Sequence, residues 1–303
     1  MDIEGRRRSS NFEDRGRGGG GGGGGLPLGA LLNVAQMLGV KGVAVLGAVL
    51  GIGYFVLPSG LKAQLFGTLS GGSGGAAPGS GSVCASSAEN GKACDFSRVI
   101  LASTEDVWSE KFQRNELPRY SEAPADYQQP TLVVFTEGVA TGGCGTASSA
   151  VGPFYCPADR KLYIDPGFYD VMERRMKAPG DFAQAYVIAH EVGHHVQHLI
   201  GATRVRVGGE SKNQTSVRVE LQADCFAGVW GHSARATLAI TEADLKEAVT
   251  AAHAIGDDTL GHSDADDYTH GTSAQRIRWF RRGFEGGDPR QCDPFAIEDA
   301  TKL

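Results

Sequence analysis

Apolar positions recur every three to four residues through much of the chain after residue 85. This spacing is typical of amphipathic helices, in which one face packs against a core. The segments with this pattern are 96–112, 167–177, 184–201, 217–233, 242–255 and 273–284. The second half of the chain is therefore predicted to be mostly helical.

Strand-like runs are few and short. They are TLVVF at 131–135, VGPFY at 151–155 and KLYID at 161–165. The residues CPADR join the last two runs and are typical of a hairpin turn. We therefore predict an α+β fold, mostly helical with a small antiparallel sheet, over residues 85–303, which are enough for a substantial core.

The 44 glycines are concentrated before this domain. Eight of them are consecutive at Gly18–Gly25, and Gly67–Val83 has the composition of a flexible linker. We therefore expect a disordered Gly/Arg-rich arm over 1–25 and a flexible linker over 59–84.

An uncharged apolar stretch, Gly42–Leu57, lies between these glycine-rich segments. It is at the short end of the ~17–25 residues that cross a bilayer, and we predict a transmembrane helix over 40–58. A buried helix of a soluble protein and a cleaved signal peptide are the alternatives. Residues 26–39 are expected to form an interfacial segment. Gly47 and Gly51 form a GxxxG pair that could join two spans in a homodimer, although membrane helices are ordinarily rich in glycine.

Basic residues are unevenly placed around this stretch. Only Lys62 follows it closely, whereas Arg6, Arg7, Arg8, Arg15, Arg17 and Lys41 precede it. The positive-inside rule then predicts a single-pass inner-membrane protein with a cytoplasmic N-terminus and a periplasmic domain. The net charge of -6 argues against a nucleic-acid partner.

Six cysteines without a C-x-x-C pair favour disulfides over a cysteine metal site, in keeping with an extracytoplasmic domain. Short loops favour Cys84–Cys94 and Cys144–Cys156, which leaves Cys225–Cys292. A free buried thiol is the alternative, above all at Cys225, which lies in a helical pattern.

The segment QAYVIAHEVGHHVQHLIG, residues 184–201, contains the motif H-E-x-x-H at His190, Glu191 and His194. Positions i and i+4 share one face of a helix, so the two imidazoles can bind one zinc ion. Glu191 can then accept a proton from the zinc-bound water. Of the other histidines here, we expect His195 to be structural and His198 to pack near the site.

A catalytic zinc needs a third protein ligand. A metzincin would continue H-x-x-G-x-x-H, but Gln197 and Ile200 occupy those positions. Downstream, VELQADCFAGVW offers Glu220 as a ligand and Asp224, one turn later, as a partner for the N–H of a ligand histidine. The alternative is a surface glutamate beside an unrelated aspartate.

HEVGHHVQ followed by ELQADCFAGVWGH resembles the bacterial putative neutral zinc metallopeptidase family, membrane-anchored proteins of gluzincin type. The segments GPFYCPADRKLYID, AIGDD and THGTSAQRIRWFRRGFEGGDP are also similar to that family. The resemblance implies a zincin-like fold, a Zn²⁺ cofactor and a peptide or protein substrate. It also implies that His270 stabilises the oxyanion and that Arg276 supports the site, with a capping or solvent-facing histidine as the alternative.

The resulting hypothesis is hydrolysis of peptide bonds by zinc-bound water, with Glu191 as the general base. The substrate would add as a strand to the edge of the sheet formed by 151–165. A catalytically silent, zinc-stabilised envelope protein that binds partners is the alternative, although such a protein would not need Glu191. The acidic residues are expected to form a solvated loop, with a calcium site as the alternative; they are Asp257, Asp258, Asp264, Asp266 and Asp267.

Overall fold

A computed structural model describes residues 1–17, 81–120, 126–261 and 264–303. These ranges belong to one compact unit, Met1–Gly18 with Gly79–Leu303, and Gly19–Pro78 is assigned to a second. No helix within the described ranges is long and apolar enough to span a bilayer. The predicted membrane helix over 40–58, with Gly47 and Gly51, and the interfacial segment over 26–39 lie outside the described residues.

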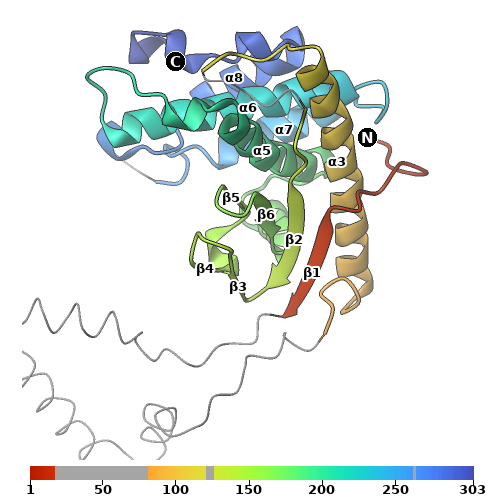
Figure 1. Cartoon of the computed structure of the whole chain (residues 1–303). Helices are drawn as coiled ribbons and strands as arrows, with labels where there is room; N and C mark the ends of the chain where they lie inside the picture. The colour runs from red at the N-terminus through yellow and green to blue at the C-terminus, as the bar shows by residue number, and fades with distance from the viewer. Residues whose placement is uncertain (18–80, 121–125, 262–263) are drawn as a thin grey trace, which may run out of the picture. The chain divides into compact units, whose positions relative to one another are not determined.

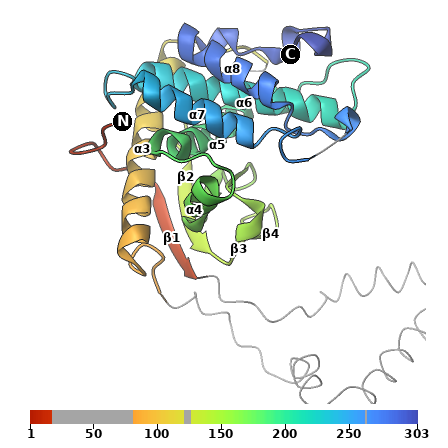
Figure 2. The ribbon, with the colours of Figure 1, turned by 180° about the vertical axis from the view of Figure 1, so that it is seen from behind.

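Every helix expected from the apolar spacing is present. Ser211, Thr241 and Thr272 each close a capping box at the first turn of a helix, which satisfies backbone N–H groups that lack an internal partner. The helices are α3 (Ala88–Gln113), α4 (Gly167–Arg174), α5 (Asp181–Ile200), α6 (Lys212–Ala234), α7 (Glu242–Ala254) and α8 (Ser273–Gly286). Figures 1 and 2 show α5 to α8 gathered on one side of the sheet, with α3 running alongside both.

The main sheet has four strands in the order β1-β2-β6-β5. The hairpin of β5 (Phe154–Cys156) and β6 (Lys161–Ile164) is antiparallel as predicted, and β2 (Thr131–Thr136) pairs parallel to β6. The prediction of a small antiparallel sheet is therefore correct for the β5–β6 hairpin and wrong for β2, because β2 and β6 are connected by a crossover rather than by a hairpin. A separate two-stranded sheet joins β3 (Gly138–Ala140) to β4 (Thr146–Ser148).

The prediction of a disordered arm is wrong for residues 1–17. β1 (Phe12–Arg17) pairs parallel to β2, from Phe12 opposite Leu132 to Arg17 opposite Thr136. The amino group of Met1 lies 2.8 Å from a carboxylate oxygen of Asp244, on α7. A polar, arginine-rich composition predicted disorder, but the partners of these residues lie far along the chain.

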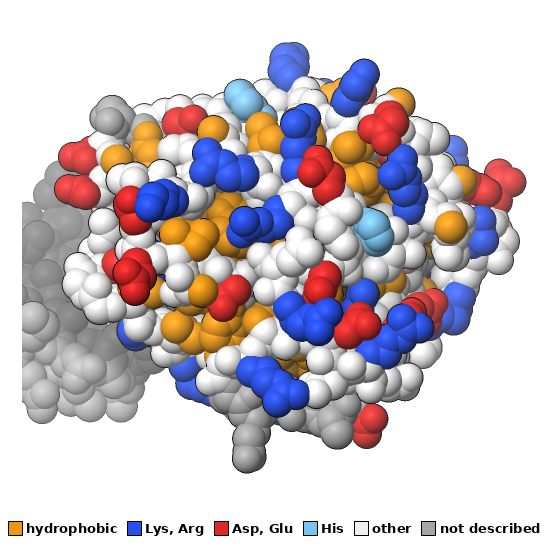
Figure 3. Space-filling model, turned by 90° about the horizontal axis from the view of Figure 1, so that it is seen from above, with side chains coloured by type: hydrophobic (Ala, Val, Ile, Leu, Met, Phe, Trp, Pro, Cys, Tyr) orange, Lys and Arg blue, Asp and Glu red, His pale blue; other side chains and the backbone are white. Residues whose placement is uncertain are grey.

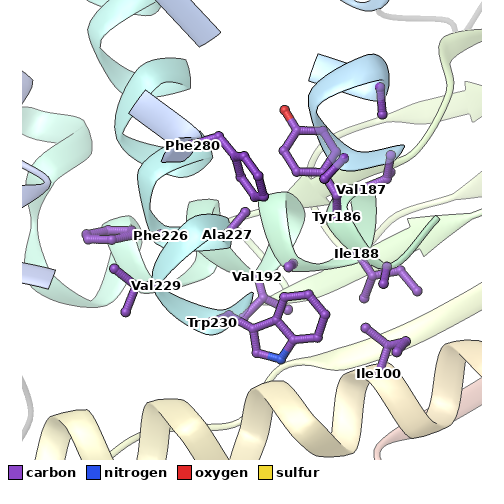
Figure 4. Close-up of a cluster of buried hydrophobic side chains, with 14 of the residues drawn as sticks. Ile100, Tyr186, Val187, Ile188, Val192, Phe226, Ala227, Val229, Trp230 and Phe280 are labelled. Carbon is purple, nitrogen blue, oxygen red and sulfur yellow. The ribbon is translucent and has the colours of Figure 1, made fainter. Parts of the chain in front are cut away.

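The largest group of buried side chains lies where α3, α5, α6 and α8 meet (Figure 4). Trp230 of α6 lies near Val192 and Ile100 in this cluster, and Phe226 of α6 packs against the ring of Trp108. α6 and α8 approach each other backbone to backbone. A Cβ on Gly228 would lie 2.1 Å from the carbonyl oxygen of Phe280, a clash that glycine avoids. This close contact fixes α8 against the face of α6 that carries the candidate site.

The three disulfides predicted from the cysteine spacing are confirmed. Cys84 pairs with Cys94, Cys144 with Cys156, and Cys225 with Cys292, so Cys225 is not a free thiol. Cys225 and Cys292 are both fully buried, and their bond ties α6 to the segment that follows α8. It closes a loop with a sequence separation of 67 and should stabilise the domain by about 4 kcal/mol in the chain-entropy estimate.

Candidate metal centre

His190, His194 and Glu220 converge at the junction of α5 and α6. The two imidazoles lie one helical turn apart on α5, with ring centroids separated by 4.7 Å. Each of the three side chains offers one ligand atom, and these atoms lie within 4.8 Å of one another. They form the one group of this kind among the described residues.

The distances from the carboxylate to the two imidazoles suit zinc ligands. Glu220 Oε2 lies 3.2 Å from His190 Nε2, and Glu220 Oε1 lies 3.4 Å from His194 Nε2. Ligands about 2.0–2.1 Å from a tetrahedral ion stand about 3.3 Å apart. Each imidazole nitrogen therefore stands at a ligand-to-ligand distance from one oxygen of the carboxylate.

The Nδ1 atom of each histidine is occupied, which leaves Nε2 for the metal. His190 Nδ1–H donates to Asp224 Oδ1 at 2.9 Å, as the sequence predicted. His194 Nδ1–H donates to Gln197 Oε1, also at 2.9 Å. The amide of Gln197 is held in this orientation because its Nε2 donates to the carbonyl of Val219 at 2.6 Å. Such partners fix the tautomer and the ring orientation of metal-binding histidines.

Gln197 was missed as a functional residue. In the sequence, Gln197 serves only to exclude a metzincin, although its position three residues after His194 puts it within reach on a helix. Asp224 was identified through the same kind of helical spacing from Glu220. The structure thus brings together the three predicted ligands and one partner for each histidine.

A buried ion pair supports Asp224 from behind. Arg276, on α8, donates from Nε to Asp224 Oδ2 at 2.9 Å and from Nη2 to Oδ1 at 3.0 Å. Tyr186 donates its hydroxyl to Oδ1 at 2.5 Å. Burial alone would raise the pKa of Asp224, but Arg276 and His190 hold it below its usual value. Arg276 is thus placed where the resemblance implied, behind the centre.

The centre favours a cation between its side chains. With Nδ1–H of His190 donating to Asp224, its Nε2 lone pair would face the carboxylate of Glu220, and two acceptors repel unless a proton or metal ion lies between them. Burial disfavours a charged His190, yet Asp224 and Glu220 raise its pKa to about 10. For Glu220, the neighbouring histidines outweigh burial and lower its pKa. The donor set therefore fits Zn²⁺, which neutral imidazole and carboxylate ligands suit.

A cavity of about 620 Å³ opens onto the three side chains. Glu191, next to His190 on α5, is partly exposed and lines its wall. Tyr155 and Phe154 of β5, the edge strand of the sheet, line another side. Most of the remaining wall is apolar, formed by Val151, Phe168, Met172, Met176, Ala178, Val187, Ala251, Ile255 and Leu260. The cavity thus combines a few polar groups with a largely apolar wall, as ligand sites generally do.

His270 lines the same cavity and is held by Asp257. Its Nδ1 lies 3.1 Å from Asp257 Oδ1, and the other oxygen of Asp257 accepts from the backbone N–H groups of residues 269–271 at 2.7–2.9 Å. Asp257 is 1% exposed. The prediction of a solvated loop is therefore wrong for Asp257, whereas Asp264, Asp266 and Asp267 are exposed as expected. The described residues contain no acidic cluster with the geometry of a calcium site.

The two remaining histidines of α5 share Tyr155 as a partner. His195 Nε2–H donates to the carbonyl of Gln128 at 2.5 Å, so its Nδ1 accepts from the Tyr155 hydroxyl at 2.9 Å. Burial lowers the pKa of His195 to about 4, which keeps the ring neutral. Tyr155 is then free to accept from His198 Nδ1 at 2.9 Å. His195 is buried and lies outside the cavity wall, whereas His198 lines the cavity. The two hydrogen bonds of Tyr155 thus connect β5 to α5, the helix that carries His190 and His194.

A second hollow, of about 710 Å³, lies over α8 and lacks this chemistry. Its wall includes Arg278, Arg281, Arg282 and Glu285 but none of the three converging side chains. On the face seen from above, basic and acidic side chains are mixed with apolar ones (Figure 3). The chemistry of metal binding is therefore found at the other cavity.

Comparison with known proteins is consistent with a zinc site in this chain. Residues 1–295 match the model of the family described as "Putative neutral zinc metallopeptidase". The chain is 50% identical over 220 residues to the uncharacterized protein YpfJ of Escherichia coli K12, covering 67% of this chain and 72% of that protein. It is 42% identical over 190 residues to the uncharacterized protein Mb2605 of Mycobacterium bovis, covering 57% and 64% respectively. No solved structure matches.

Proposed function

Because the chain belongs to the putative neutral zinc metallopeptidase family, we propose that it hydrolyses peptide bonds with zinc as its cofactor. One observation supports this most strongly. His190, His194 and Glu220 converge within 4.8 Å on a cavity that Glu191 also lines. A purely structural zinc site would not need a carboxylate such as Glu191 beside its ligands in an open cavity. This observation disfavours the alternative of a catalytically silent binding protein.

In the proposed mechanism, His190, His194 and Glu220 would hold the ion, and Asp224 and Gln197 keep both imidazoles oriented. When bound there, zinc would supply Lewis acidity and a bound water of lowered pKa. Glu191 accepts the proton of the attacking water and passes it to the leaving amine. The substrate strand would lie along β5, whose outer edge is not paired in the main sheet.

His270 would stabilise the negative charge that develops on the carbonyl oxygen. While its Nδ1–H donates to Asp257, Nε2 can donate only when the ring is protonated, so the imidazolium is the proposed donor. Asp257 then acts as a positioning residue, because it fixes both the ring and the backbone of residues 269–271.

We expect Asp257→Asn to lower kcat/KM by about 10- to 100-fold with unchanged zinc content, because the amide cannot accept all the bonds of the carboxylate. The matched control is Asp267→Asn, an exposed residue of the same loop that should behave like wild type. In a His270→Ala background, Asp257→Asn should have no further effect on kcat/KM. An equal loss in both backgrounds would contradict the positioning role.

The wall of the cavity predicts the substrate class. Phe168, Met172, Val187 and Ile255 contribute apolar surface that a bulky hydrophobic side chain would bury. Zinc-loaded protein should therefore cleave a mixed peptide library at sites flanked by Phe, Leu or Met. These residues should be preferred over Asp or Glu by at least about tenfold in kcat/KM. Cleavage without an apolar preference would contradict this assignment, and absence of cleavage would contradict the proposed function.

The three disulfides support an extracytoplasmic location, since such bonds persist in oxidising compartments. We propose that the domain works outside the cytoplasm, in the periplasm of a bacterium with two membranes.

A further inference from the structure

The N-terminal residues 1–17 are bound to the domain from end to end. The amino group of Met1 pairs with Asp244, and the side chain of Met1 packs against the core. Ser9 is fully buried and donates its hydroxyl to Glu105 of α3 at 2.5 Å. Residues 12–17 then form β1 beside β2. Contacts with α7, α3 and the sheet therefore make this segment part of the folded domain.

The described residues on either side of positions 18–80 lie in contact with each other. Asp14 accepts hydrogen bonds from the hydroxyl of Ser82 at 2.6 Å and from the N–H groups of Val83 and Cys84 at 3.0 Å. The Cys84–Cys94 disulfide fastens this point to the first turns of α3. Figures 1 and 2 both show the end of β1 beside the start of α3. Residues 18–80 are thus inserted between two points of the fold that lie in contact.

The N-terminal arginines have acidic partners in the domain. Arg8 Nη2 lies 2.6 Å from Asp95, Arg7 Nη1 lies 2.8 Å from Glu105, and Arg17 Nε lies 2.9 Å from Glu137. The positive-inside rule treats basic residues before a span as markers of the cytoplasm. Here the same residues pair with the domain, which they can do only on its own side of a membrane.

From these contacts we propose that residues 1–17 and 81–303 lie on the same side of a lipid bilayer. Residues 18–80 would then cross that bilayer an even number of times or not at all. An odd number of crossings would separate β1 from β2 and break the ion pairs of Arg7, Arg8 and Arg17. A single crossing with the two ends on opposite sides is incompatible with these contacts.

The test uses the full wild-type chain in unextracted membranes and a carbodiimide, which joins a carboxylate to an amine in contact with it. Glu13 Oε1 lies 2.5 Å from Lys161 Nζ, and this pair links β1 to β6. Lys111 and Glu116, 3.0 Å apart, form a reference pair within the domain. Mass spectrometry of the digested protein should find both cross-links in comparable yield. Lys161→Arg keeps the charge but should abolish the first cross-link alone.

The reference cross-link without the Glu13–Lys161 cross-link would overturn the proposal. As an independent readout, the exposed residues Ser10 and Ala236 can each be changed to cysteine and treated with a membrane-impermeant maleimide in sealed cells. Equal labelling of the two variants is expected, and labelling of Ala236→Cys alone would again overturn the proposal. A wild-type chain found wholly in the soluble fraction would also overturn the proposal.

Discussion

Glu191→Gln should abolish most peptide cleavage while leaving the metal in place. The amide keeps the size of the side chain but cannot accept a proton, so kcat should fall by about 10²–10⁴-fold, the usual contribution of a general base. Zinc content, measured by mass spectrometry of the metal, should stay near one ion per chain because His190, His194 and Glu220 are unchanged.

A matched control separates this effect from a general loss of charge. Glu173, an exposed residue of α4, can be changed to Gln and should retain wild-type activity and metal content. Glu191→Gln protein that cleaves at the wild-type rate would show that another group is the base. Loss of zinc from this variant would instead mean that Glu191 is a ligand.

His194→Ala and Glu220→Ala should lose both metal and activity, since two remaining ligands cannot hold a catalytic zinc ion. Zinc binding stabilises only the folded state, so added zinc should raise the unfolding temperature of wild-type protein but not of these variants. His253→Ala, at an exposed position of α7, is the control and should respond as wild type does. Tight zinc binding by Glu220→Ala would place the third ligand elsewhere.

The metal centre could be predicted because its determinants are local. His190 and His194 share a helix face, and Glu220 and Asp224 share another, so helical spacing alone brought each pair to one side. The spacing could not show that Arg276 would reach Asp224, which depends on the contact of α6 with α8. The resemblance supplied that residue instead.

Residues whose partners lie far along the chain were misjudged. Asp257 belongs to an acidic stretch whose composition predicts exposure to solvent. Its carboxylate is nevertheless buried, and it accepts hydrogen bonds from the backbone N–H groups of residues 269–271. Arg7 and Arg8 look like residues of a disordered arm when only their neighbours in the sequence are considered. Their partners, Glu105 and Asp95, lie too far along the chain to be identified from sequence spacing. β1 was overlooked for the same reason, and with it the parallel half of the sheet. Local composition therefore predicts a segment poorly when its stabilising contacts are remote.

The central claim is that this chain is a zinc-dependent peptidase, and peptide cleavage before and after removal of the metal tests it most directly. Purified wild-type protein should cleave a peptide with an apolar residue at the scissile bond. It should lose this activity after dialysis against a chelator and regain it on addition of about one equivalent of zinc per chain. Calcium or magnesium should not restore it, because both prefer sites with six or more oxygen ligands. Cleavage that persists in metal-free protein, or zinc-loaded protein that cleaves no peptide, would contradict the account.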